Sequence, residues 1–114
     1  MAEPLLSIVV PVFNEEEVLR ELYDQLKTVL QQIEGEHEIL FINDGSSDAS
    51  IEILRALRRQ DPNVKFLDLS RNFGQSTATR AGLDYAQGDA VIIMDADLQD
   101  PPELIPEMLK YFEA

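Results

Sequence analysis

Hydrophobic and polar positions along the chain follow two patterns in turn. Short apolar runs rich in β-branched residues predict strands that are buried on both faces, as in a parallel sheet. They cover residues 6–12, 38–43, 64–69 and 90–94. After each run, apolar residues recur at spacings of three and four, which predicts an amphipathic helix. The chain is therefore predicted to alternate strand and helix throughout.

The helix boundaries follow from capping residues. The first helix is expected to begin at Asn14 as N-cap, with acids in its first turn, and to close at Gly35. The second should be capped by Asp48 or a neighbouring serine, the third should span about 75–86, and the last should start near Pro101. This order indicates one α/β domain with an open, mainly parallel sheet, strand order 3-2-1-4, and helices on both faces.

Polar side chains follow the end of each predicted strand. Glu15, Asp44, Asn72 and the pair Asp95 and Asp97 all occupy such positions. Ligands of open α/β sheets bind outside the carboxyl ends of the strands, where the strand order reverses. With order 3-2-1-4 that point lies between the first and fourth strands, so Glu15 would face the two aspartates. Taken singly, each acid also fits an ordinary turn or the first turn of a helix.

The segment 95–100, with the sequence Asp-Ala-Asp-Leu-Gln-Asp, concentrates three carboxylates and an amide directly after a buried strand. Acids near a core are costly unless they are paired, and Mg²⁺ or Mn²⁺ prefers such oxygen ligands. The chain has no Gly-x-Gly-x-x-Gly or Gly-Lys-Ser/Thr element, so a metal is the better way to hold a diphosphate. The alternative is an acidic loop that caps the next helix.

Composition narrows the function further. The 114 residues are 45% hydrophobic and carry a formal charge of −13, which argues against binding to nucleic acid. The absence of cysteine excludes a disulfide scaffold and a thiolate metal site. The apolar stretch 5–13 is interrupted by Ser7 and Pro11 and is too short to span a bilayer, so no transmembrane segment is expected.

Three motifs resemble family 2 glycosyltransferases of the GT-A fold, and the last resembles their polyprenyl- or dolichyl-phosphate branch. They are the segments 8–16, 42–48 and 95–103, with the Asn-Phe-Gly-Gln segment 72–75 before the last. By this resemblance Pro11, Phe13 and Glu15 would line the nucleoside pocket, Ile42 and Asp44 would hold the base, Asp95 and Ala96 would contact the ribose, and Asp97 and Gln99 would bind Mg²⁺ or Mn²⁺. Phe13 stands where many relatives have tyrosine.

The resemblance implies a metal-assisted, inverting transfer of a sugar from a UDP- or GDP-sugar to a polyprenyl or dolichyl phosphate, at the cytoplasmic face of a membrane. Residues 1–114 would be the donor-binding, Rossmann-like half of the GT-A fold, a soluble piece that is inactive alone. The acceptor-binding part and the general base would lie after Ala114, so no catalytic residue is assigned. The shortened sheet would leave an edge open, which is a route to a homo-oligomer.

Two non-enzymatic functions are alternatives: a nucleotide-binding module that has lost transfer, and a phosphoacceptor receiver domain. A receiver needs an aspartate at the end of the third strand and a lysine after a fifth strand. Here the third strand is predicted to end in Leu69-Ser70-Arg71, and no fifth strand is predicted.

Overall fold

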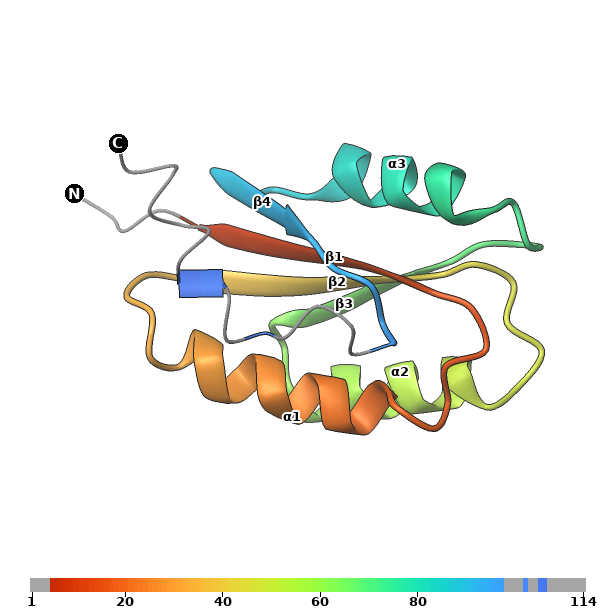
Figure 1. The fold of residues 1–114 in the computed structure, drawn as a ribbon, viewed down its shortest axis with the longest axis horizontal. Helices are drawn as coiled ribbons and strands as arrows, with labels where there is room; N and C mark the ends of the chain where they lie inside the picture. Colours follow the sequence, from red (N-terminus) through yellow and green to blue (C-terminus); the bar gives the residue numbers. More distant parts are fainter. Residues whose placement is uncertain (1–4, 98–101, 103–104, 107–114) are drawn as a thin grey trace.

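The computed structural model describes residues 5–97, 102 and 105–106 (Figure 1). Strands and helices alternate along this part of the chain. The elements are β1 (Leu6–Val12), α1 (Leu19–Leu30), β2 (His37–Asn43), α2 (Ser50–Gln60), β3 (Val64–Asp68), α3 (Gln75–Tyr85) and β4 (Ala90–Ile93).

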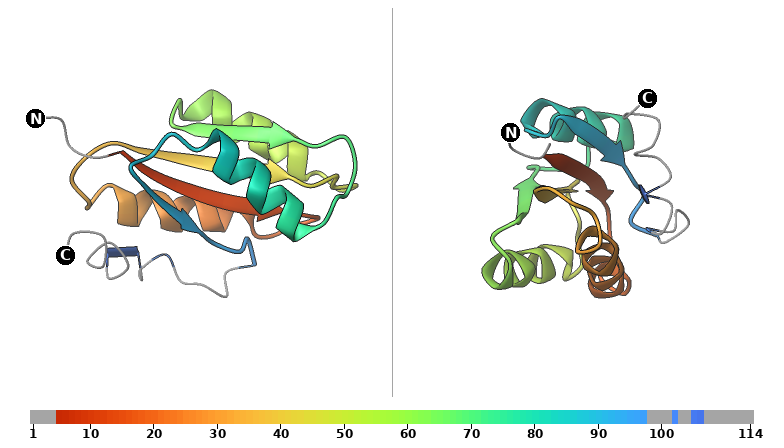
Figure 2. Two further views of the ribbon diagram at one scale, coloured as in Figure 1. Left: turned by 90° about the horizontal axis from the view of Figure 1, so that it is seen from above. Right: turned by 90° about the vertical axis from the view of Figure 1, so that its left-hand side faces the viewer.

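The strands form one parallel sheet in the order β3-β2-β1-β4, which confirms the predicted topology. Helices α1 and α2 lie side by side on one face, and α3 lies on the other (Figures 1 and 2). The two central strands are therefore covered on both sides, which explains why their sequences are almost continuously apolar.

Alternate side chains of β1 enter two separate cores. Ile8 and Val10 are fully buried and pack in the larger core with residues of α1 and α2, while Val9 packs with Ala78 of α3. Burial of each such aliphatic side chain contributes roughly 1.5–3 kcal/mol. Gly82 lets α3 approach closely, because a Cβ there would collide with the side chain of Val9.

Several predicted element boundaries were wrong. Helix α1 begins at Leu19 rather than after Asn14, and it ends at Leu30, short of Gly35. Asn14 instead adopts a left-handed backbone conformation with φ of 53°, and its Oδ1 accepts a hydrogen bond from the backbone N–H of Ser47 at 2.8 Å. Asn14 thus serves the turn after β2 and not its own helix. Strand β3 ends at Asp68, one residue earlier than predicted.

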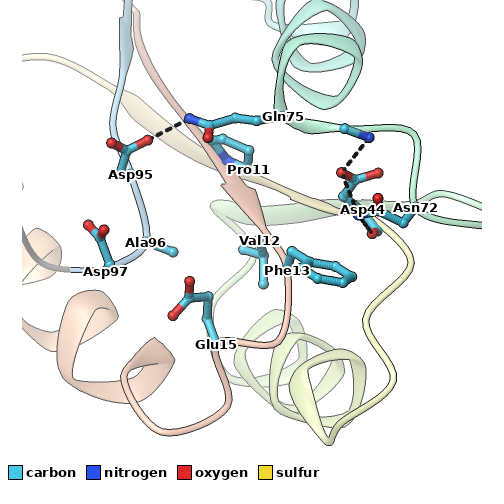
Figure 3. A pocket seen from close by; sticks show the side chains of 11 residues that line it. Pro11, Val12, Phe13, Glu15, Asp44, Asn72, Gln75, Asp95, Ala96 and Asp97 are labelled. Carbon is cyan, nitrogen blue, oxygen red and sulfur yellow. Dashed lines mark hydrogen bonds between the residues drawn. The ribbon is translucent and has the colours of Figure 1, made fainter.

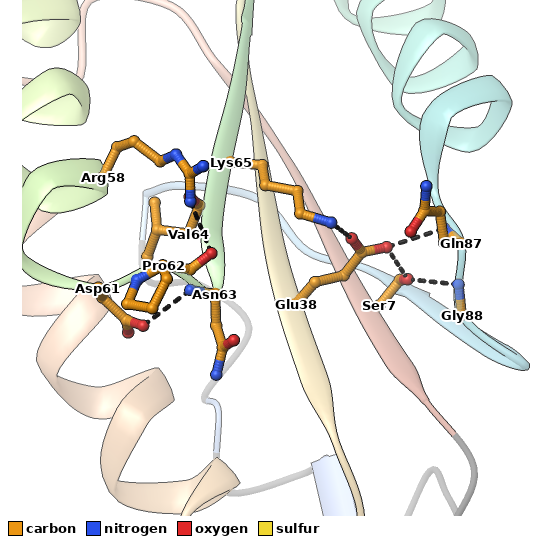
Figure 4. A network of polar contacts seen from close by, with 10 residues as sticks. All are labelled: Ser7, Glu38, Arg58, Asp61, Pro62, Asn63, Val64, Lys65, Gln87 and Gly88. Atoms are coloured by element: carbon orange, nitrogen blue, oxygen red, sulfur yellow. Dashed lines mark hydrogen bonds and ion pairs between the residues drawn. The ribbon is translucent and has the colours of Figure 1, made fainter.

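A buried polar network joins all the strands at the amino end of the sheet (Figure 4). Glu38 of β2 is 3% exposed and accepts hydrogen bonds from Lys65 Nζ of β3 at 2.8 Å, from the Ser7 hydroxyl of β1 and from the backbone N–H of Gln87 at 2.8 Å. The Ser7 hydroxyl in turn accepts the N–H of Gly88, just before β4, at 2.8 Å. Sequence analysis did not identify this network.

In the described part of the chain, no helix is long and apolar enough to cross a bilayer. The predicted last helix falls mostly outside the described residues, and so does Gln99. Ile105 is described and is fully buried in the larger core.

Candidate functional site

A pocket of about 370 Å³ opens at the carboxyl end of the sheet, between β1 and β4 (Figure 3). This is the point where the strand order reverses, the usual place for a ligand in an open α/β sheet. The pocket is lined by Pro11, Val12, Phe13, Glu15, Asp44, Asn72, Gly74, Gln75, Asp95, Ala96 and Asp97.

Pro11 accounts for the opening between the two strands. The Val9 carbonyl faces β4 and accepts the N–H of Met94 at 3.0 Å. Pro11 lies two residues further along the same strand and so faces the same neighbour, but it has no N–H to donate. Pairing of β1 with β4 ends at Val9, whereas pairing with β2 continues to Val12. The strands therefore separate where the pocket begins.

The loops after β1 and β2 brace each other beside this opening. The Glu15 N–H donates to the Ser50 hydroxyl at 3.0 Å, and the Glu16 N–H donates to Asp48 Oδ2 at 3.2 Å. In return, Glu16 Oε2 accepts the N–H of Ala49 at 3.2 Å. Asp48 also accepts the Ser50 N–H at 2.9 Å, but the N-cap of α2 is Ala49, which makes no side-chain capping bond, so the prediction that Asp48 or a serine caps this helix was wrong. Glu15 is thus held by its backbone while its side chain faces the pocket.

Asp44 fixes the third loop, the one between β3 and α3. Its carboxylate is 2% exposed and accepts hydrogen bonds from the N–H groups of Phe73 at 2.8 Å and Gly74 at 3.0 Å, and from Asn72 Nδ2 at 3.2 Å. Gly45 allows the close approach: its φ is 69°, and a Cβ would collide with the backbone of Asn72. Three of the roughly four acceptor positions of the carboxylate are therefore filled by the protein itself.

Acidic side chains lie near one another on the side of the pocket away from Asp44 (Figure 3). Burial raises the pKa of Glu15, and the negative charges of Asp97 and then Asp48 raise it further. Asp97 is exposed, and Asp95 is half-buried and accepts a hydrogen bond from Gln75 Nε2 at 2.8 Å. Figure 3 shows Glu15 and Asp97 on the same side of the pocket. The free protein thus concentrates negative charge at the switch point of the sheet.

These side chains fit a divalent cation that is shared with a ligand. The described residues contain no group of three or more His, Cys, Asp or Glu side chains able to hold a metal by themselves. Mg²⁺ typically uses one or two carboxylates and completes its shell with water and substrate phosphates. Asp97 offers such a carboxylate, and a cation beside it would relieve the repulsion that raises the pKa of Glu15.

The structure brings most of the predicted site residues together. Pro11, Phe13, Glu15, Asp44, Asp95, Ala96 and Asp97 all line the pocket. Ile42 is fully buried in the smaller core under α3, so its side chain does not line the pocket. Val12, Gly74 and Gln75 were not assigned to the site. The strand register would have placed Val12 there. Gln75 was noted only as the last residue of the segment 72–75 in the family resemblance, without a role.

Comparison with known sequences gives consistent matches. The profile described as "Glycosyl transferase family 2" matches residues 7–114. The uncharacterized glycosyltransferase YkcC of Bacillus subtilis is 60% identical over 104 residues, which are 91% of this chain and 32% of that protein. The bactoprenol glucosyl transferase of Shigella phage SfV is 50% identical over 109 residues, 96% of this chain and 36% of that protein. The chain thus spans about a third of the length of these relatives.

Solved structures share the fold. The mannosyltransferase PcManGT of Pyrobaculum calidifontis, in complex with GDP-Man and Mn²⁺, matches with a TM-score of 0.74 at 22% identity, over 85% of this chain and 28% of that one. Glucosyl-3-phosphoglycerate synthase of Mycobacterium tuberculosis, in complex with Mn²⁺, UDP and glucosyl-3-phosphoglycerate, matches with a TM-score of 0.73 at 24% identity, over 96% and 39%. The sheet order β3-β2-β1-β4 with helices on both faces is therefore that of the GT-A-like proteins.

Proposed function

Because the chain belongs to glycosyl transferase family 2, we propose that its pocket binds a nucleotide-sugar donor and that the protein transfers the sugar of that donor. The observation that carries this proposal is the pocket itself. It lies at the switch point of the sheet, and Glu15 and Asp97 bring like charges together at its edge. This is the arrangement expected where a cation and a diphosphate complete the site.

Several lining residues have positions that suit the proposed roles. Phe13 is 47% exposed at the pocket and offers a face for a planar base. Asp44 retains about one acceptor position for the ligand, and we assign the ribose contacts to Asp95 and Ala96, which line the same pocket. Asp97, together with Gln99, would hold the cation. The bound cation would offset the negative charge that grows on the departing nucleoside diphosphate.

We propose that residues 1–114 are the donor-binding part of the enzyme, and we assign no general base among them. Similarity to bactoprenol glucosyl transferases supports a polyprenyl phosphate as acceptor, and hence work at the cytoplasmic face of a membrane. We further propose an inverting transfer that uses Mg²⁺ or Mn²⁺. Self-association is also part of the proposal, because β4 lies at an edge of the sheet and Ile93 on it is 44% exposed.

A receiver-like function is not favoured by the site. Asp68 does stand at the end of β3, but it accepts a hydrogen bond from Asn43 Nδ2 at 2.9 Å and does not line the pocket.

Calorimetric titration tests the donor pocket. UDP and GDP would each be added to the protein, with and without Mn²⁺, after circular dichroism has established that the sample is folded. We expect one nucleotide to saturate the protein only when Mn²⁺ is present. A folded protein that is saturated by neither nucleotide would contradict the proposed function.

A further inference from the structure

Gln75 forms a bridge between two loops of the pocket. It is the first residue of α3, and its side-chain Nε2 donates to Asp95 Oδ1 at 2.8 Å, across 20 residues of sequence. In Figure 3 this hydrogen bond runs beside Pro11 and joins the loop after β3 to the loop after β4. Neither residue belongs to the buried core, so the bridge is not a packing requirement.

The bridge is placed where the sheet stops holding the chain. Backbone pairing between β1 and β4 ends with the Met94 N–H on the Val9 carbonyl, because Pro11 has no N–H to continue it. The carboxylates of Asp95 and Asp97 come directly after that last hydrogen bond. Beyond this point, the hydrogen bond from Gln75 Nε2 to Asp95 Oδ1 links the acidic loop to α3.

The other end of the bridge is anchored firmly. The buried Asp44 carboxylate accepts the N–H groups of Phe73 and Gly74, and the Gly74 carbonyl accepts the N–H of Ala78 at 3.0 Å in the first turn of α3. A chain of contacts therefore runs from the end of β2, through the start of α3, to Asp95. Gln75 thus connects the start of α3, which Asp44 holds, to a loop that follows the last backbone hydrogen bond between β1 and β4.

We propose that Gln75 is a positioning residue of the donor site: it fixes Asp95, and through the short loop Asp97, in the orientation that binds the nucleoside diphosphate and its cation. This inference rests on the proposed function. The family resemblance includes Gln75 in the segment 72–75 but implies no role for it.

The amide group suits this task better than a charged group would. A neutral donor orients a carboxylate while leaving its negative charge available to a cation. A lysine would form an ion pair and reduce the negative potential of the site, and a glutamate would add repulsion beside Asp95. An amide thus separates orientation from charge, and variants at position 75 can separate the two effects experimentally.

The test compares Gln75→Ala and Gln75→Lys with Gln25→Ala. Gln25 is the matched control, because its Nε2 donates to Glu21 Oε1 at 3.4 Å on the exposed face of α1, away from the pocket. Calorimetry would measure the affinity for UDP or GDP across a range of Mn²⁺ concentrations. Amide hydrogen exchange at residues 95–97 would be measured without any ligand.

We expect Gln75→Ala to weaken nucleotide binding about 10-fold, in line with the loss of one hydrogen bond to a charged group. Its amides at residues 95–97 should exchange faster than those of the unsubstituted protein. Gln75→Lys should keep exchange slow but need several-fold more Mn²⁺ for the same nucleotide affinity. Gln25→Ala should match the unsubstituted protein in every measurement.

Unchanged affinity and unchanged exchange in Gln75→Ala would overturn the inference while leaving the donor pocket intact. Gln75→Lys with an unaltered Mn²⁺ requirement would overturn the argument from the neutral amide. If the unsubstituted protein binds neither nucleotide, the proposed function fails and the ligand-binding role of Gln75 fails with it. The exchange data would still show whether Gln75 holds the loop.

Discussion

The pKa of a glutamate is shifted in opposite directions at the two ends of the sheet. At the amino end, Glu38 is almost completely buried; burial alone would raise its pKa, but hydrogen bonds from Lys65, Ser7 and the Gln87 N–H together lower it. At the carboxyl end, burial raises the pKa of Glu15, and the charges of Asp97 and Asp48 raise it further. One carboxylate has its partners within the protein, and the other faces like charges.

Under the proposed function, this difference separates a structural acid, Glu38, from an acid of the ligand site, Glu15. The Glu38 network is complete, so it stabilises the native state and has nothing to gain from a ligand. The negative charges of Asp97 and Asp48 are unfavourable for the Glu15 carboxylate in the free protein, and the cation of the proposed function would offset them. Asp44 lies between these two cases, because three of its acceptor positions hold the β3–α3 loop and about one remains for a ligand.

The largest effect is expected from Asp97→Asn, which removes a carboxylate from the acidic side and leaves the amino end untouched. Nucleotide affinity in the presence of Mn²⁺ should fall about 100-fold, because the amide carries no negative charge and binds a hard cation more weakly than a carboxylate does. Calorimetry with and without Mn²⁺ measures this loss. Stability toward urea should not fall.

Asp84→Asn provides the control for net charge. Asp84 is exposed on α3 and does not line the pocket, so this variant changes the charge by the same amount without altering the site. Its affinity for nucleotide should equal that of the unsubstituted protein. An equal loss in both variants would mean that overall charge, and not the position of Asp97, governs binding.

Glu38→Gln is expected to show the opposite of Asp97→Asn: lower stability and unchanged nucleotide binding. The amide cannot pair with Lys65, and it places an N–H group where Ser7 and Gln87 supply donors. We expect the free energy of unfolding to fall by about 2 kcal/mol. This is less than the loss for a fully buried ion pair, because Lys65 is partly exposed. Urea unfolding at neutral pH measures the change.

Glu34→Gln, on the exposed surface after α1, is the matched control and should leave the urea midpoint unaltered. Mn²⁺-dependent nucleotide binding should be the same in both variants. A loss of binding in Glu38→Gln, in a sample that remains folded, would show that the two ends of the sheet are coupled.

The same contrast explains how far the sequence could be interpreted. Topology and strand order were predictable because apolar runs in β1 and β2 leave those strands no option but burial on both faces. The acids at the carboxyl ends were predictable for a related reason, since the parallel sheet delivers every strand end to one edge. Both predictions follow from local patterns together with one topological rule.

What the sequence left open depends on contacts between distant residues. Asn14 has the residue type of an N-cap, but its side chain serves a turn more than thirty residues away, so α1 begins later than predicted. Gln75 and the Ser7–Glu38 pair likewise acquire their meaning only from partners across the fold. No periodicity or spacing encodes such contacts. The role of Asp44 as a holder of the β3–α3 loop belongs to the same class.

The smallest effect is expected from Glu15→Gln. This variant tests whether the ionised Glu15 carboxylate lowers the free energy of unfolding, whereas that of Glu38 raises it. A carboxyl group whose pKa is raised on folding keeps its proton in the native state at pH values just above its unfolded pKa near 4.5, where the unfolded chain has already lost it. Its contribution to the free energy of unfolding therefore falls as pH rises through the native pKa, and the deficit persists at neutral pH. Because Glu15 is partly solvated, Glu15→Gln should gain no more than about 0.5 kcal/mol at pH 7 without metal.

Glu38→Gln should show the opposite pH dependence, which makes the two variants controls for each other. The lowered pKa of Glu38 contributes stability that is complete above its unfolded pKa near 4.5 and is lost as pH falls through the lower native pKa. Urea unfolding from pH 3 to 7, each variant measured against the unsubstituted protein, gives both differences. If Glu15→Gln lost stability with rising pH as Glu38→Gln does, Glu15 would have a favourable partner in the free protein, and the carboxyl end would not be the electrostatically unfavourable side of the sheet.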